Sequence, residues 1–140
     1  MAIYMLDTSI ASAIIVGRVD LDARLELTGP AWWCISAVTR AELSFGVRRR
    51  PEATKLSRLV DAFLRAARTE PFDARAADEF GRLRAELERR GESIGIADGL
   101  IAAHALSIGA VIVTDNERHF SRVPQLSIEN WLRRTGAPGN

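Results

Sequence analysis

Three short apolar runs, each followed by polar residues, constrain the fold of this chain most. Residues 2–6, 31–35 and 110–113 are almost continuously apolar, without the alternation of a half-exposed strand. Such runs are typical of strands that are buried on both faces of a sheet. Helical patterns follow the first two runs, and strands that alternate with helices predict an α/β domain. We therefore expect a mainly parallel sheet with helices on both faces, in three layers.

Turn residues and helix-capping residues place the remaining elements. The 140 residues are the size of one domain, so we assign residues 1–134 to a single domain. The small and polar residues 135–140 predict a disordered tail. Counted from their capping residues, helices are expected at about 10–17, 20–27, 36–49, 51–68, 73–90 and 96–108, and short strands at 70–72 and 126–128.

Composition limits the cellular context more than the function. Cys34 is the only cysteine, which rules out an intrachain disulfide and is compatible with a cytoplasmic protein. No apolar leader and no stretch of the roughly 20 apolar residues that span a membrane is seen. The net charge of +1 does not by itself indicate a nucleic-acid partner. All basic residues except Lys55 are arginine, however, and arginine suits phosphate recognition.

Acidic and amide side chains from distant parts of the chain fall at equivalent places in this pattern. Asp7 ends the first apolar run, and Asp115 and Asn116 follow the run 110–113. Glu42 and Asp98 lie early in the helices expected at 36–49 and 96–108. In parallel sheets the carboxyl ends of the strands form one edge, and ligands bind where the strand order reverses. If runs 2–6 and 110–113 are neighbours, these side chains meet in one crevice.

Each of these residues also has a structural interpretation. Asp7 or Ser9 would cap a helix, and Asp98 would stabilise a helix start. Asp115 and Asn116 suit a turn. Glu42 would be an exposed helix residue. Two carboxylates 4 Å apart repel by about 4 kcal/mol at an effective dielectric of 20, so a cluster of them needs protonation or a cation. Oxygen donors without cysteine or histidine favour Mg²⁺ or Mn²⁺, the equipment for phosphodiester hydrolysis.

Four segments of the sequence stand out together: MLDTS at 5–9, SAVTRAELSFG at 36–46, IADGLIAAHA at 96–105 and VTDNERHF at 113–120, followed by VPQL at 123–126 and ENW at 129–131. They resemble the motifs of PIN-domain ribonucleases, and the last of them resembles VapC-type toxins of toxin–antitoxin systems. This resemblance implies a five-stranded parallel sheet and Mg²⁺- or Mn²⁺-dependent endoribonuclease activity on structured RNA, often tRNA, in single-stranded loops. It also implies a small VapB-like antitoxin that inserts a peptide across the active site, and a dimer or a higher toxin–antitoxin assembly.

The resemblance also implies roles for individual residues. Asp7 and Asp98 would be the main metal ligands, and Glu42 would help to bind the metal and polarise water. The fourth position departs from the family pattern of Thr-x-Asp: Asn116 aligns with the acid, and Asp115 stands one place early. This puts a firmly bound second metal in doubt. The catalytic set is then Asp7, Glu42, Asp98 and Asn116; the metal ligands are Asp7, Asp98, Glu42 and Asp115; and the supporting hydroxyls are those of Thr8, Ser9 and Thr114.

Several other residues have two interpretations. Arg48 and Arg49 belong to a run that is either a solvated helix end or a site for RNA phosphates. His119 would touch RNA or cap a turn. His104 lies on the apolar helix 96–108 and is interpreted as a core residue. The three tryptophans are interpreted as core or interface residues.

Three other classes of protein also gather acids at strand ends. A phosphoacceptor receiver domain needs a lysine near its last strands, but Lys55 lies mid-chain. A haloacid-dehalogenase-type phosphatase needs a second aspartate two places after the first, where this chain has Ser9. The remaining alternative is a PIN-fold protein that is catalytically inactive and binds a protein partner.

Overall fold

Five parallel strands form one sheet at the centre of the molecule. The computed structural model describes residues 1–132, so the predicted tail 135–140 and the predicted domain end at 134 lie outside the described residues. The strand order is β3-β2-β1-β4-β5, and every neighbouring pair is parallel. The predicted α/β fold with a five-stranded parallel sheet is thus confirmed. The strands are β1 (Ala2–Leu6), β2 (Ala31–Ser36), β3 (Thr69–Glu70), β4 (Val111–Val113) and β5 (Ile128–Glu129).

The apolar runs bury both faces of this sheet, as predicted. Along β1, Leu6 points into one core and Met5 into the other, and both side chains are fully buried. Cys34 lies in the second core, as expected of a small apolar residue. Because successive side chains point to opposite faces of a strand, a continuous apolar run supplies both cores.

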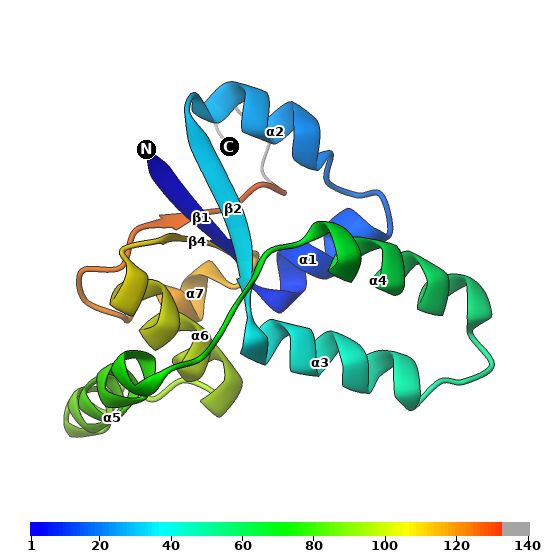
Figure 1. Cartoon of the computed structure of the whole chain (residues 1–140). Coiled ribbons are helices and arrows are strands. Elements are labelled where there is room, and N and C mark those ends of the chain that lie inside the picture. The colour runs from blue at the N-terminus through cyan, green and yellow to red at the C-terminus, as the bar shows by residue number, and fades with distance from the viewer. Residues whose placement is uncertain (133–140) are drawn as a thin grey trace.

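Helices cover the sheet on both sides and complete the three layers (Figure 1). One core is built with α1 (Thr8–Ile15), α2 (Leu21–Thr28), α3 (Ala37–Arg48) and α4 (Thr54–Ala66). The other is built with α5 (Ala74–Arg89), α6 (Ile96–Ile108) and the short α7 (Glu117–Phe120). Within the described residues, no helix combines the length and the apolar character that crossing a membrane requires.

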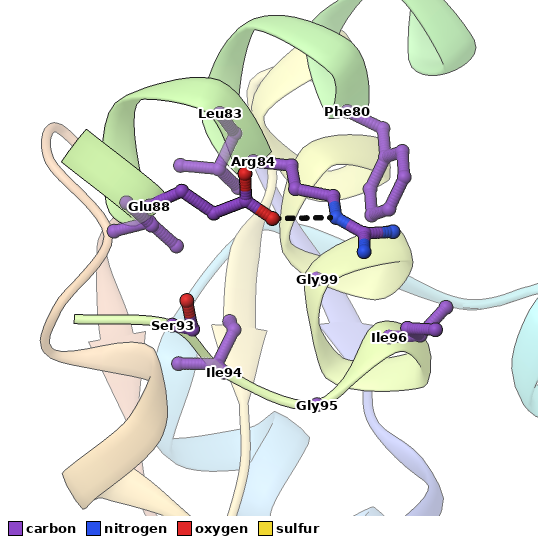
Figure 2. Close-up of a pocket in the computed structure, with 10 residues that line it drawn as sticks. Phe80, Leu83, Arg84, Glu88, Ser93, Ile94, Gly95, Ile96 and Gly99 are labelled. Carbon is purple, nitrogen blue, oxygen red and sulfur yellow. Dashed lines mark hydrogen bonds and ion pairs between the residues drawn. The ribbon is translucent and has the colours of Figure 1, made fainter. Parts of the chain in front are cut away.

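The α5–α6 pair forms a closely packed layer of its own. A Cβ atom on Gly99 of α6 would lie 3.1 Å from Cε1 of Phe80 on α5, so the glycine permits this close approach. A small hollow opens beside the contact, lined by both helices and the segment that joins them (Figure 2). Gly99 follows Asp98 directly, so this packing fixes the first turn of α6, from which the Asp98 side chain projects.

The ends of several elements differ from the prediction. β3 is Thr69–Glu70 and not 70–72, because Pro71 has no N–H to donate to a neighbouring strand. The last strand is Ile128–Glu129 and not 126–128, in register with Ile112 and Val113. α4 begins at Thr54, three residues after Pro51. The helix α7 was not predicted; Phe120 is completely buried and anchors it.

Candidate active site

Asp7 lies where the strand order reverses, between the carboxyl ends of β1 and β4. Its backbone N–H donates to Val113 O at 2.9 Å, and the residue is only 2% exposed. Its Oδ1 accepts hydrogen bonds from Ile10 N–H at 2.9 Å and from Ser9 Oγ at 2.6 Å. The bond from Ile10 makes Asp7 the N-cap of α1. Asp7 therefore has the predicted capping role, and this role fixes its carboxylate at the edge of the sheet.

Thr114 joins the end of β4 to this carboxylate. Its buried hydroxyl donates to Asp7 Oδ2 at 2.5 Å and accepts from Asn116 N–H at 2.8 Å. Asp115 N–H donates to Ser9 Oγ at 3.1 Å, a second link between the two strand ends. The ends of runs 2–6 and 110–113, which were expected to be neighbours, thus lie side by side in the structure.

Asn116 connects this pair of strand ends to α6. Its Nδ2 donates to Asp98 Oδ2 at 2.9 Å, and its backbone is held by Thr114. His119 lies on the same cluster, with Nδ1 at 2.8 Å from Asn116 Nδ2 and 3.4 Å from Asp98 Oδ2. The Asp98 side chain is 28% exposed, so it is partly open to solvent. Four of the residues singled out in the sequence are therefore joined in one network: Asp7, Thr114, Asn116 and Asp98.

Glu42 approaches the network from α3 and is held by a different partner. Its Oε1 accepts a hydrogen bond from Thr8 Oγ1 at 2.5 Å, and Thr8 Oγ1 also lies 3.4 Å from Thr39 Oγ1. The residue is exposed. Of the three hydroxyls named from the sequence, those of Ser9 and Thr114 contact Asp7, whereas that of Thr8 contacts Glu42.

The side chain of Asp115 has a hydrogen-bond partner outside the Asp7–Asp98 network. Its Oδ1 accepts from Asn130 Nδ2 at 3.1 Å, and the same amide donates to Glu117 Oε2 at 3.1 Å. Asn116 is thus the residue of this turn that contacts Asp98. Sequence reasoning missed Asn130 and Glu117 as part of this site; the only signal was the place of Asn130 in the segment ENW.

Burial dominates the electrostatics of Asp7. Loss of hydration raises the pKa of its carboxyl group above the usual value, and the nearby charge of Asp98 raises it further. The hydrogen bonds from Ser9, Thr114 and Ile10 lower the pKa but do not outweigh burial. A buried carboxylate beside a second acid is stabilised by a cation, which favours the charged form of both.

The donor atoms at this edge fit a hard divalent cation, although they are not gathered into a complete cluster. A carboxylate has about four acceptor positions, and three hydrogen bonds occupy Asp7, which leaves room for one metal–oxygen contact. Asp98 adds a second, partly exposed carboxylate. Among residues 1–132, no three acidic, histidine or cysteine side chains lie close enough together to hold a metal ion. Glu42 accepts a hydrogen bond from Thr8 and Asp115 accepts one from Asn130, so each of these two acids has its own partner.

The other residues considered from the sequence fall into two groups. His104 is buried, and its Nδ1 lies 2.8 Å from Ser36 Oγ, as expected of a core histidine. Trp131 is buried as well. Arg48 and Arg49 lie at the end of α3, where Arg48 Nε donates to Ser44 Oγ at 3.3 Å.

Comparison with known proteins agrees with this architecture. Residues 4–126 match the family described as PIN domain. Ribonuclease VapC2 from Rickettsia felis is 38% identical over 131 residues, which cover 92% of this chain and 98% of that protein. The tRNA(fMet)-specific endonuclease VapC from Salmonella typhimurium is 35% identical, over 91% of this chain and 97% of that protein.

Solved structures lead to the same family. The VapBC2 structure from Rickettsia felis, bound to a DNA fragment from the promoter, superposes with a TM-score of 0.84 at 37% identity, over 92% of this chain and 98% of that one. The VapBC-1 structure from nontypeable Haemophilus influenzae gives a TM-score of 0.83 at 28% identity, over 94% and 99%. This chain belongs to the PIN-domain family and, within it, to the VapC ribonucleases.

Proposed function

We propose that this protein is a metal-dependent endoribonuclease that hydrolyses phosphodiester bonds in structured RNA. The observation that carries the proposal is the buried Asp7 carboxylate at the strand-order reversal, linked through Thr114 and Asn116 to Asp98. Capping of α1 uses only Oδ1 of Asp7 and does not require a second acid nearby, whose charge raises the pKa of Asp7 further. Perturbed acids of this kind cluster at functional sites.

Asp7 and Asp98 would hold Mg²⁺ or Mn²⁺, and Glu42 and Asp115 would supply further oxygen ligands. When bound, the metal activates water and offsets the negative charge that develops on the phosphate. Ser9 and Thr114 orient the Asp7 carboxylate, and the amide of Asn116 orients Asp98. Such supporting hydrogen bonds hold ligands in the geometry that binding requires.

The substrate we infer is tRNA, cut in a single-stranded loop. The Salmonella typhimurium relative is named as a tRNA(fMet)-specific endonuclease, which supports this substrate class. Phosphates of the bound RNA would be contacted by Arg48, Arg49 and His119, all of which lie on elements that also carry site residues. The particular tRNA would be selected by the surface around the crevice.

A cognate VapB-like antitoxin would neutralise this activity, which makes the protein the toxin of a two-protein system. The VapBC complexes from Rickettsia felis and Salmonella typhimurium support such a partner. In the cell the toxin would form a homodimer or a larger assembly with its antitoxin.

The test is cleavage of total tRNA and ribosomal RNA by purified, antitoxin-free protein in Mg²⁺, Mn²⁺ or EDTA. We expect a discrete cut that disappears in EDTA and in Asp7→Asn and Asp98→Asn. Asp78→Asn, at an exposed acid on α5, is the matched control and should cut like the wild type. Folded protein that cuts no RNA in either metal would favour the alternative, an inactive PIN-fold module that binds a protein partner. The side chains of Glu42 and Asp115, each held by a neighbour, are the observation on which that alternative rests.

A further inference from the structure

One face of α3 carries an acid, an aromatic ring and an arginine in sequence along the helix axis. Glu42, Phe45 and Arg49 are spaced by three and four residues, so they lie on the same side of the helix. Glu42 belongs to the candidate active site, and Arg49 lies about 10 Å further along at 1.5 Å per residue. We call Phe45 and Arg49 the α3 platform.

The aromatic ring of this platform is unusually open. Phe45 is 63% exposed, and the guanidinium carbon of Arg49 lies 5.6 Å from the centre of its ring. Both groups present flat surfaces on which a nucleic-acid base stacks, and unpaired RNA bases are commonly bound in this way.

Within residues 1–132, no carboxylate forms an ion pair with Arg48 or Arg49 beside Phe45. Arg49 packs on the ring, and Arg48 donates to the hydroxyl of Ser44. On α5, by contrast, arginines are paired with glutamates, as Arg84 is with Glu88 at 3.4 Å. The charge on α3 therefore remains available for a polyanion, next to the acids of the site.

The surface is also continuous with the active site. A groove of about 200 Å³ runs between α1, α3 and α4, and its lining includes Thr8 and Glu42 at one end and Arg49 and Arg50 at the other. An RNA strand that passes Glu42 can therefore continue along α3 to Arg49, with Phe45 beside the groove and not in its lining.

From this arrangement we propose that the α3 platform is a base-stacking subsite for an unpaired nucleotide beside the scissile bond of the RNA. The assignment rests on the ribonuclease function proposed above. Phe45 takes the face of the base, and Arg49 takes the adjoining phosphate. The subsite selects single-stranded over paired RNA, because a base within a helix has no free face to stack.

The experiment measures binding and cleavage of a short fluorescein-labelled single-stranded RNA by wild type, Phe45→Ala, Phe45→Tyr and Arg49→Ala. Phe45→Ala should weaken binding by about 5- to 150-fold, the range for one lost base stack, and raise KM more than it lowers kcat. Phe45→Tyr should restore binding. Arg49→Ala should reduce the slope of log Kd against the logarithm of the salt concentration by about one, the contribution of one phosphate contact. Leu27→Ala on α2 and Arg75→Ala on α5, both exposed, are the matched controls.

A set of RNAs with a single abasic nucleotide at successive positions identifies the stacked base. At one position, RNA with an abasic nucleotide should bind the wild type as weakly as intact RNA binds Phe45→Ala. Binding of that abasic RNA to Phe45→Ala should be no weaker still. Equal cleavage by wild type and Phe45→Ala would overturn the subsite and leave the ribonuclease function intact. If wild type neither binds nor cuts RNA, both proposals fail. If Phe45→Ala changes only self-association, measured by light scattering, the surface belongs to a protein partner and the subsite is overturned.

Discussion

The Asp7 side of the site and its α3 side hold their carboxylates by different means. Asp7 is 2% exposed and accepts hydrogen bonds from a backbone amide and a hydroxyl of the first turn of α1 and from the hydroxyl of Thr114 after β4. Glu42 is exposed and accepts from the hydroxyl of Thr8. The first carboxylate is therefore positioned by the fold itself, whereas the second is free to reorient by rotation of one side chain.

This difference separates stability from activity in the two regions. Changes around Asp7 alter a buried, hydrogen-bonded network, so they affect folding as well as chemistry. Changes on the exposed face of α3 touch little of the core, so they affect what binds there. The substitutions below test this division, beginning with the largest expected effect.

Replacing Asp7 with asparagine should abolish cleavage and should change the stability of the fold in a way that depends on pH. We expect kcat/KM to fall by at least a factor on the order of 10²–10³, typical for a lost charge-stabilising group. Because burial raises the pKa of Asp7, its ionised form destabilises the folded state. That penalty is absent at low pH and grows as the pH rises through the folded pKa.

The stability of Asp7→Asn relative to wild type, measured by thermal unfolding in EDTA, should therefore increase with pH and then level off. Asp78→Asn on α5 should show no such trend. A variant that becomes less stable than wild type as the pH rises would contradict the raised pKa.

Replacing Thr114 with valine should damage both folding and cleavage. The substitution removes the donor to Asp7 Oδ2 and the acceptor for Asn116 N–H, and both groups lie in a buried network. We expect a loss of about 1–3 kcal/mol in unfolding free energy and about 10- to 100-fold in cleavage rate. Thr28→Val, at a hydroxyl that bonds only the nearby carbonyls of Leu25 and Gly29, should leave cleavage unchanged. Wild-type cleavage by a folded Thr114→Val protein would show that Asp7 does not need this support.

The sequence predicted the Asp7 side well for a physical reason. Runs 2–6 and 110–113 are apolar enough to require the centre of a sheet, and parallel strands bring their carboxyl ends together. The convergence of Asp7 with Thr114 follows from those two facts. The two-residue strands β3 and β5 were placed less accurately, because pairing with β2 and β4 defines their ends and local residue preferences do not.

The hydrogen-bond partners of individual site side chains could not be predicted from the sequence. The spacing of apolar residues placed Glu42 near the start of a helix. It did not predict that the hydroxyl of Thr8 would donate to the Glu42 carboxylate. The contact of Asn130 with Asp115 and Glu117 joins residues 15 and 13 positions apart, across α7 and the segment that follows it. Such contacts depend on the final packing, since no periodic pattern marks them. The roles assigned to the individual site residues stay predictions that the substitutions test.

His104 links the Asp98 helix to the Glu42 helix. Its effect on the stability of the protein depends on pH and is smaller than the effects above. It lies on α6 and bonds Ser36, the N-cap of α3, so it ties the helix of Asp98 to the helix of Glu42. Burial lowers the pKa of His104, although the charges of Glu70 and Asp73 oppose this. The unfolded chain therefore takes up a proton as the pH falls through about 6.5 while the folded chain does not, and stability is lost.

Thermal unfolding between neutral and mildly acidic pH should show this loss in wild type and a weaker loss in His104→Gln. Each unit of pKa difference corresponds to about 1.4 kcal/mol. An identical pH dependence in the two proteins would assign the acid sensitivity to other groups.

The smallest expected effects come from replacing two glycines, one on α3 and one on α5, so the two substitutions allow a direct comparison of these helices. Gly46 on α3 and Gly81 on α5 are both helical, and no atom lies within 4 Å of where a Cβ would stand. Alanine at either position should stabilise the protein by about 1 kcal/mol, because glycine is a poor helix former. Chemical denaturation checks this, and equal gains are expected.

The two variants should differ only in their action on RNA. Gly46 lines the groove between α1, α3 and α4, so the added methyl group narrows the path beside the α3 platform. Gly46→Ala should therefore raise KM for RNA by a small factor, whereas Gly81→Ala should leave it unchanged. If both variants cleave RNA like the wild type, the path of the strand lies away from this groove, and the exposed face of Phe45 is approached from the other side of α3.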